Sequence, residues 1–171
     1  MNGRRVVVTG LGTINPIGHN VDETWDNARN GQSGIDWIKN FDTSQIAVKI
    51  AGEVKNLEPD EVFDRKIARR TDRAQQFALV AAGEALKDAG LEITEENMYE
   101  VGVLVGSGIG GIITTVNTVL NFEDKGQRGV RAPMVAPLLA DQISAQISID
   151  YNLRGPNYTI INACSTGNNA I

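Results

Sequence analysis

Short apolar runs that end in glycine or small polar residues recur along the chain and predict buried strands. The runs cover residues 6–9, 101–105 and 158–163, and they are rich in β-branched side chains. Continuous apolar runs of about four to eight residues are typical of strands that are covered on both faces. A looser alternation over residues 46–54 predicts a further strand, which Gly52 weakens.

Helical spacing of apolar residues separates these strands. Helices are predicted over residues 64–89, 112–122 and 138–151, and from Asn20 or Asp22 up to Gly31. The longest of them carries many alanines on its apolar face and is ended by Gly90. The polar segment 124–133 is predicted to be a loop. Because strands alternate with helices, the sequence predicts an α/β fold with a largely parallel sheet and no internal linker.

Composition narrows the class of protein further. The 171 residues suit one domain, and 42% apolar with 22% charged residues is ordinary globular composition. No apolar run approaches the roughly 18 residues of a membrane-spanning helix. The run of three valines near the start is too short for a signal peptide. The single cysteine cannot form an internal disulfide. We therefore expect a cytoplasmic protein.

Charge is distributed unevenly along the chain. The net charge of −5 argues against a general nucleic-acid binder. Five cations nevertheless stand close together against a single acid, Asp72: Arg65, Lys66, Arg69, Arg70 and Arg73. Such a run is most often a solvated helix face, but on an acidic protein it also suits a specific acidic partner.

A glycine motif follows the predicted strand 101–105. Gly106, Gly108 and Gly111 match the spacing of a dinucleotide-binding loop. That kind of site also needs an acidic residue about 20 positions on, at the end of a second strand. Glu123 and Asp124 have the spacing but follow a predicted helix. We therefore interpret the glycines as positions where backbones pass closely beside a buried site, and a nucleotide-binding domain is disfavoured.

Cys164 stands where an apolar run breaks into Ser165, Thr166 and Gly167. A lone cysteine is most often a small buried apolar residue. At the start of a helix, however, the helix dipole and free N–H groups stabilise a thiolate, which makes the sulfur a better nucleophile. The same N–H groups can face the oxyanion of a thioester under attack. The pattern predicts an acyl-transfer nucleophile.

Many separate motifs occur from about Arg4 to the end of the chain. They include RRVVVTGLG at 4–12, PIG at 16–18, GQSGI at 31–35, LEITEEN at 91–97, GSGIGG at 106–111, LRGP at 153–156 and NACSTG at 162–167. Together and in register, these motifs resemble those of β-ketoacyl synthases of type II fatty-acid synthesis, and the subgroup that they resemble most is β-ketoacyl-[acyl carrier protein] synthase II.

The resemblance implies a thiolase-like layered αβαβα fold, with residues 1–171 covering most of its amino-terminal half. It implies a homodimer that catalyses decarboxylative condensation in fatty-acid elongation. Cys164 would take an acyl group from acyl carrier protein, and the carbanion formed when malonyl-carrier protein loses CO₂ would attack that thioester. No metal or organic cofactor is implied beyond the phosphopantetheine arm that arrives on the carrier.

The resemblance also assigns roles to individual residues. Ile109 and Gly108 fall where such enzymes bind the acyl substrate. Four cations fall where the family meets the acidic carrier protein: Lys66, Arg69, Arg70 and Arg128. His19 falls where the family has no catalytic residue, and we interpret it as a surface histidine.

Three departures from the family pattern bear on these expectations. The family needs two further histidines and a lysine beyond the nucleophile, whereas the chain ends at Ile171. We expect it to be truncated just after the nucleophile and to be inactive alone. Residues 132–137 read APMVAP where the family usually carries a pair of phenylalanines, which leaves the acyl-chain length open. The pair Ser165-Thr166 after the cysteine differs from the usual small residues without an expected effect.

Two other readings within the same superfamily stay open. The chain could belong to the ketosynthase of a type II polyketide system, which shares these motifs. It could also be a non-catalytic partner like a chain-length factor, although such partners typically lose the nucleophile and Cys164 is kept. Protection against heat by NAD(P) would instead support the nucleotide-binding alternative.

Overall fold

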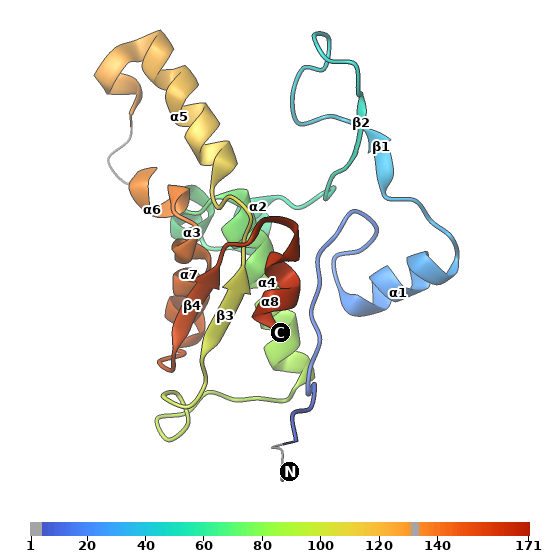
Figure 1. The fold of residues 1–171 in the computed structure, drawn as a ribbon, viewed down its shortest axis with the longest axis vertical. Coiled ribbons are helices and arrows are strands. Elements are labelled where there is room, and N and C mark those ends of the chain that lie inside the picture. The colour runs from blue at the N-terminus through green and yellow to red at the C-terminus, as the bar shows by residue number, and fades with distance from the viewer. Residues whose placement is uncertain (1–4, 131–133) are drawn as a thin grey trace. The chain divides into compact units, whose positions relative to one another are not determined.

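The computed structural model describes residues 5–130 and 134–171 (Figure 1). These residues divide into two compact units. The first unit consists of the described residues up to Glu58 together with Val80–Leu91. The second consists of Pro59–Leu79 and Glu92–Ile171. The helix α4 (Arg73–Asp88) contributes its first turns to the second unit and its later turns to the first.

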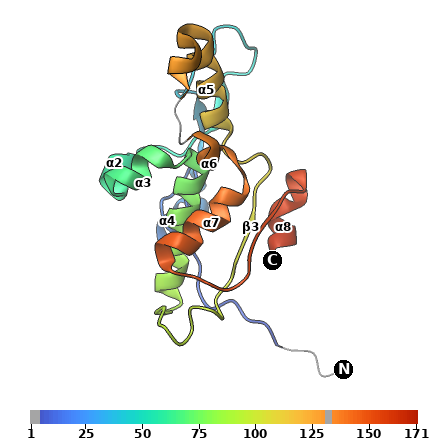
Figure 2. The same ribbon diagram turned by 90° about the vertical axis from the view of Figure 1, so that its left-hand side faces the viewer.

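A parallel pair of strands lies at the centre of the second unit. Strand β3 (Val103–Gly106) pairs with β4 (Asn157–Ile160), with Val103 opposite Asn157 and Gly106 opposite Ile160. Figure 2 shows helix α7 (Asp141–Tyr151) on one face of this pair and α8 (Thr166–Ala170) on the other. The parallel pairing confirms the sheet type predicted from the alternation of strands and helices.

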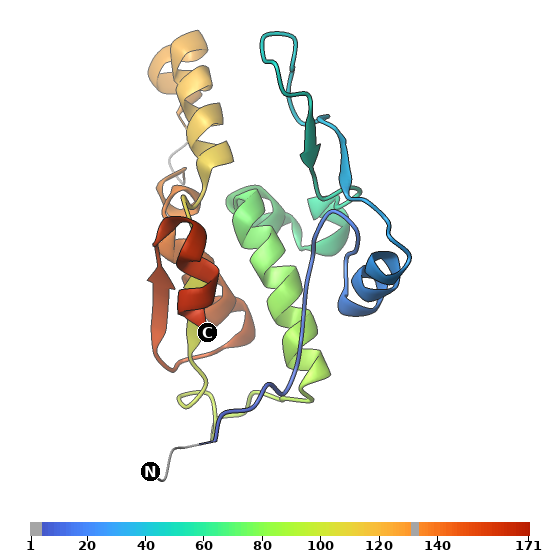
Figure 3. The same cartoon turned by 45° about the vertical axis from the view of Figure 1, so that its right-hand side comes forward.

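Further helices complete the second unit. Helix α5 (Ile112–Lys125) follows β3 through a short loop (Figure 3). The other helices are α2 (Pro59–Val62), α3 (Arg65–Arg70), η1 (Gly126–Gly129), α6 (Val135–Leu138) and η3 (Ala163–Ser165). The buried apolar core of this unit consists of Leu79, Val103, Ile143, Ile147 and Leu153. None of the helices within the described ranges is long and apolar enough to cross a membrane.

The first unit combines a capped helix with a small hairpin. In α1 (Val21–Arg29) the side chain of Asn20 accepts a hydrogen bond from the Glu23 N–H, so Asn20 is the N-cap and the helix is confirmed. Strands β1 (Ile35–Trp37) and β2 (Ile50–Gly52) pair antiparallel. The carboxylate of Glu84, on α4, accepts hydrogen bonds from the backbone of the segment that precedes α1 and from Val21 N–H.

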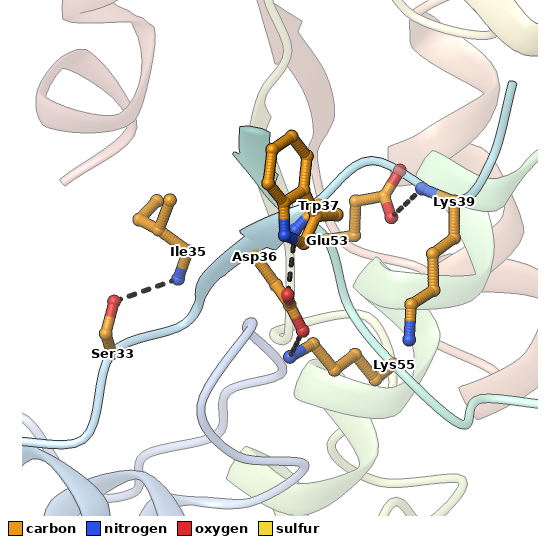
Figure 4. A network of polar contacts seen from close by, with 7 residues as sticks. All are labelled: Ser33, Ile35, Asp36, Trp37, Lys39, Glu53 and Lys55. Carbon is orange, nitrogen blue, oxygen red and sulfur yellow. Dashed lines mark hydrogen bonds and ion pairs between the residues drawn. The ribbon is translucent and has the colours of Figure 1, made fainter. Parts of the chain in front are cut away.

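Charged side chains hold the hairpin together (Figure 4). The carboxylate of Asp36 accepts hydrogen bonds from Lys55 Nζ at 2.9 Å and from the Trp37 N–H at 2.8 Å. The Glu53 carboxylate accepts from the Lys39 N–H at 2.9 Å. The hydrogen bond from Lys55 and that from Trp37 lower the pKa of Asp36 below its ordinary value.

The strand predicted over residues 6–9 is wrong. This segment has no strand assignment, and Val6 and Val8 are 91% and 79% exposed. A strand needs a neighbour to satisfy its backbone N–H and C=O groups, and no strand in the described part of the chain pairs with it. Beyond it the segment lies against α4, where a Cβ at Gly10 would come within 2.6 Å of the Ala89 nitrogen.

Several predicted boundaries also need correction. The helix over 64–89 is broken into α3 and α4, because Thr71 is extended with ψ 145°. The segment over 124–129 is helical rather than a loop, and residues 131–133 lie outside the described ones. The helix predicted over 138–151 is confirmed as α7 but begins at Asp141, and Leu138 is the last residue of the separate helix α6. The strands are short and only partly buried, with Tyr158 65% exposed, and β1 was not predicted at all.

Candidate active site

Two loops that carry predicted site residues begin at the same edge of the parallel pair. The glycine loop follows β3 at Gly106, and the cysteine turn follows β4 at Ile160. The two strand ends are in contact, because the Ser107 N–H donates to the Ile160 carbonyl at 3.1 Å. The carboxyl ends of parallel strands are where α/β folds place their ligand sites, so this edge is the candidate active site.

Cys164 is exposed and lies in η3, just ahead of α8. The residue before it, Ala163, has a φ of 44°, in the left-handed region that alanine rarely adopts. Strained backbone of this kind tends to persist at functional positions, because only the surrounding structure can hold it. The sequence prediction of a sharp strand-to-helix junction at Cys164 is confirmed, although the first turn is a 3₁₀ helix.

Thr166 stabilises the turn that carries Cys164. Its hydroxyl accepts a hydrogen bond from the Asn162 N–H at 2.9 Å and donates to the Ala163 carbonyl at 2.6 Å. The residue is buried, with 4% of its surface exposed. Thr166 therefore links Asn162 to Ala163, the residue with the strained φ. Its position in the sequence, two residues after the cysteine, did not suggest this role.

The glycines of the loop allow the close packing that the sequence predicted. A Cβ at Gly106 would meet the backbone oxygen of Thr166 at 2.7 Å, and one at Gly111 would collide with the Pro137 carbonyl. At Gly108 there is open space. Glu123 and Asp124 lie within α5 rather than at the end of a strand, so the loop lacks the acidic partner of a dinucleotide site.

Gly108 and Ile109 occupy the exposed part of this loop. Ile109 is 70% exposed, and the loop is tightened by a hydrogen bond from the Gly110 N–H to the Ser107 hydroxyl at 2.9 Å. An apolar side chain that projects from a glycine loop beside a nucleophile could contact an acyl chain. The structure thus places Ile109 at the same sheet edge as Cys164, and its role in acyl binding stays a prediction.

The predicted carrier-binding cations lie on two short helices. Lys66, Arg69 and Arg70 project from α3, and Arg128 lies in η1; all four are exposed. Within the described residues none of them forms an ion pair. Arg69 and Arg70 line a pocket of about 310 Å³ whose wall includes α5 and Gly129, the neighbour of Arg128. The pocket therefore connects the two cationic elements.

His19 is half-buried rather than a free surface residue. Its Nε2 lies 2.6 Å from the Lys55 carbonyl, which is the geometry of a donated hydrogen bond that links two loops of the first unit. This hydrogen bond gives His19 a structural role, and no catalytic role is needed to account for it. No group of three or more His, Cys, Asp and Glu side chains in the described ranges could hold a metal ion.

Three buried polar residues were missed by the sequence reasoning. Asp72, Gln75 and Gln76 are 3–4% exposed at the start of α4, where the predicted helix ran through without interruption. A signal was available, because an acid followed three residues later by glutamine is the pattern of a capping box. The polar network that these residues form contacts α3, α5 and α7.

The fold of the chain is similar to the folds of several solved structures. A ketosynthase/chain length factor for ishigamide superposes with a TM-score of 0.78 at 27% identity, covering 92% of this chain and 40% of that one. A β-ketoacyl synthase from Burkholderia phymatum superposes with a TM-score of 0.77 at 20% identity, covering 98% and 41%. The fold is therefore the amino-terminal portion of the thiolase-like fold of ketosynthases, as the sequence predicted.

Sequence comparison identifies the family. The family model described as "Beta-ketoacyl synthase, N-terminal domain" matches residues 3–171, so the chain belongs to the β-ketoacyl synthase family. The 3-oxoacyl-[acyl-carrier-protein] synthase 2 of Staphylococcus aureus strain COL is 46% identical over 168 residues, which are 98% of this chain and 41% of the relative. The Coxiella burnetii protein of the same name is 40% identical over 167 residues, 98% of this chain. The chain thus spans about two fifths of these relatives' length.

Proposed function

We propose that this chain supplies the nucleophile of a 3-oxoacyl-[acyl-carrier-protein] synthase, an acyltransferase that elongates fatty acids. The observation that carries the proposal is Cys164, exposed on a strained turn at the carboxyl edge of the parallel strands. The 46% identity to synthase 2 of Staphylococcus aureus supports fatty-acid elongation as the pathway.

The chemistry proceeds in two transfers. The Cys164 thiolate attacks the thioester carbonyl of an acyl-carrier protein, a new S–C bond forms, and the carrier's phosphopantetheine thiol leaves with a proton. A malonyl-carrier protein then loses CO₂, and its bond electrons form a carbanion at the α-carbon. That carbon attacks the Cys164 thioester, a C–C bond forms, and the cysteine thiolate leaves from a 3-oxoacyl product.

Residues beyond the nucleophile have supporting parts in this proposal. Ile109 and Gly108 contact the acyl chain. The resemblance implies that decarboxylation also uses two histidines and a lysine beyond the nucleophile, at positions after Ile171. The thiol of Cys164 forms the thioester, the phosphopantetheine arm arrives on the carrier, and no metal or organic cofactor is needed.

The partner is an acidic acyl carrier protein that delivers both acyl and malonyl groups. The exposed cations Lys66, Arg69, Arg70 and Arg128 form its docking surface, because none of them is neutralised by an acid within the described residues. One structural neighbour, at 21% identity, is a type II polyketide acyl-carrier protein in complex with its ketosynthase. That complex supports a carrier protein as the partner. We also propose that the enzyme is a cytoplasmic homodimer.

A ketosynthase of a type II polyketide system is the second candidate. The ishigamide neighbour and the type II polyketide complex are structurally similar, but their identities of 27% and 21% are well below the 46% of the fatty-acid enzyme. A chain-length factor is less favoured, because the nucleophile Cys164 is present.

The test is a condensation assay with the whole protein. Acyl- and malonyl-carrier proteins are mixed with the enzyme, and released CO₂ and carrier-bound product are followed by mass. The proposal expects one mole of CO₂ per 3-oxoacyl product that is two carbons longer. Products extended repeatedly without reduction would support the polyketide candidate. Absence of both products would overturn the synthase proposal.

A further inference from the structure

One carboxylate, that of Asp72, lies at the start of two helices. Its Oδ1 accepts a hydrogen bond from the Ala74 N–H at 3.0 Å, in the first turn of α4. Its Oδ2 accepts from both the N–H and the hydroxyl of Thr114, at 2.9 and 2.7 Å, in the first turn of α5. Asp72 is 4% exposed, so these bonds form away from water.

Helix α5 has no side-chain cap of its own. Its N-cap residue, Gly111, has no side chain to accept from the first N–H groups. Asp72, 42 residues earlier in the chain than Thr114, therefore supplies the missing acceptor and places a carboxyl group at the positive end of the helix. The residues immediately before α5 are the glycine loop, with Gly108 and Ile109.

The backbone of Asp72 follows the basic helix α3 closely in the chain. Asp72 lies two residues after Arg70, the last residue of α3. Its own N–H donates to Gln75 Oε1 at 2.7 Å, which completes the reciprocal pattern of a capping box. Gln76 Nε2 lies 3.3 Å from the Thr71 hydroxyl, and Gln75 Nε2 donates to the Gln142 carbonyl at 3.1 Å on α7. The end of α3 is thereby fixed to the same polar network.

We infer that Asp72 is a positioning residue that connects the carrier-binding helix α3 to the glycine loop and sets where Ile109 stands beside the acyl chain. The inference rests on the proposed function. It goes beyond it by assigning acyl-length selectivity in part to a buried carboxylate that contacts neither substrate nor nucleophile. The connection runs from α3 through Asp72 and Thr114 to the loop that precedes α5.

The test compares four variants of the whole protein. Asp72→Asn and Thr114→Val weaken the hydrogen bonds between Asp72 and Thr114, whereas Thr114→Ser keeps both donors to Asp72. Thr118→Val is the matched control, because that hydroxyl donates to the Thr114 carbonyl within α5 itself. Two quantities are measured: amide hydrogen exchange of residues 107–114, and the ratio of kcat/KM for an eight-carbon against a sixteen-carbon acyl-carrier substrate.

We expect Asp72→Asn and Thr114→Val to accelerate exchange and to change the selectivity ratio by about fivefold, the effect of one lost hydrogen bond. Thr114→Ser and Thr118→Val should match the wild type in both. Unchanged amide exchange in Asp72→Asn and Thr114→Val overturns the inference. Faster amide exchange with an unchanged kcat/KM ratio also overturns it, since Asp72 would then only cap helices.

The wild-type protein separates the two claims. A wild type that makes no 3-oxoacyl product overturns the proposed function, and the inference with it. A wild type that is active and is matched by these variants overturns the inference alone.

Discussion

The hydroxyl of Ser144 lies 2.7 Å from Oδ1 of Asn157, and Ser144 has no exposed surface. In return the Asn157 amide nitrogen donates to the Ser144 carbonyl at 2.9 Å. Thr159 Oγ1 is also 2.9 Å from the Ser144 hydroxyl. These contacts join the middle of α7 to two residues of β4, the strand that leads into the turn of Cys164. A polar cluster around the buried Ser144 thus positions the strand that leads into the turn of Cys164.

Ser144→Ala should therefore destabilise the whole protein by about 0.5–1.5 kcal/mol, because Asn157 Oδ1 on β4 loses its hydrogen bond from the Ser144 hydroxyl. The measurement is the free energy of unfolding in denaturant. The matched control is Ser148→Ala on the same helix, which removes only one of two acceptors of the Asn157 amide nitrogen. Equal losses in the two variants would contradict the special role of Ser144.

Gly106→Ala should lower the unfolding temperature sharply. The added Cβ would lie 2.7 Å from the Thr166 backbone oxygen, so either β3 or the cysteine turn must move. Gly108→Ala is the control, because nothing lies within 4 Å of a Cβ there. Thermal unfolding of both variants checks the prediction. A Gly106→Ala protein as stable as Gly108→Ala would show that the loop and the turn are not in close contact.

Reversing charge on α3 should weaken carrier binding. In Arg69→Glu and Arg70→Glu, we expect the KM for acyl-carrier substrate to rise about tenfold with a small change in kcat, because attractive charges become repulsive. The effect should shrink as salt is added. Arg29→Glu, at the end of α1, makes the same charge change outside the docking surface and serves as the control. An equal rise in KM in Arg29→Glu would mean that the net charge of the protein, and not these two positions, determines carrier binding.

The Asp36 carboxylate should stabilise the hairpin in a pH-dependent manner. Its folded pKa is lowered from 3.8, chiefly by the hydrogen bond from Lys55, so the folded state favours the ionised form. The stabilisation is fully present above pH 3.8 and is lost as the pH falls through the lower folded pKa. Asp36→Asn should therefore speed amide exchange of β1 and β2 at pH 7, and the variant-to-wild-type ratio should approach one in acid. A ratio independent of pH would contradict this account.

The sequence predicted those elements whose signals are local. Asn20 and Gly90 mark helix ends as expected, and Gly90 has a φ of 59°. The break between α3 and α4 also has a local signal, the capping box of Asp72 and Gln75, but the apolar spacing over residues 64–89 continues across it and predicted one helix. The strand expected at residues 6–9 did not form for a non-local reason, since apolar β-branched residues form a strand only beside a partner.

The residues of the candidate site also differ in whether a local sequence pattern marks them. Cys164 and the glycine loop were found because each has a strong local pattern at the end of a strand. The contributions of Thr166 and Asp72 depend on hydrogen bonds whose partners only the folded chain identifies. The basic cluster was visible in the sequence, but the pocket that joins α3 to η1 was not.

The most direct test of the account is to find the atom that carries the acyl group. The whole protein is incubated with acyl-carrier protein in the absence of malonyl groups and is then digested. The masses of its peptides are measured by mass spectrometry. We predict one added acyl mass on the peptide that contains Cys164 and none in Cys164→Ala, which should also make no 3-oxoacyl product. An acyl group on another residue, or full condensing activity in Cys164→Ala, would contradict it.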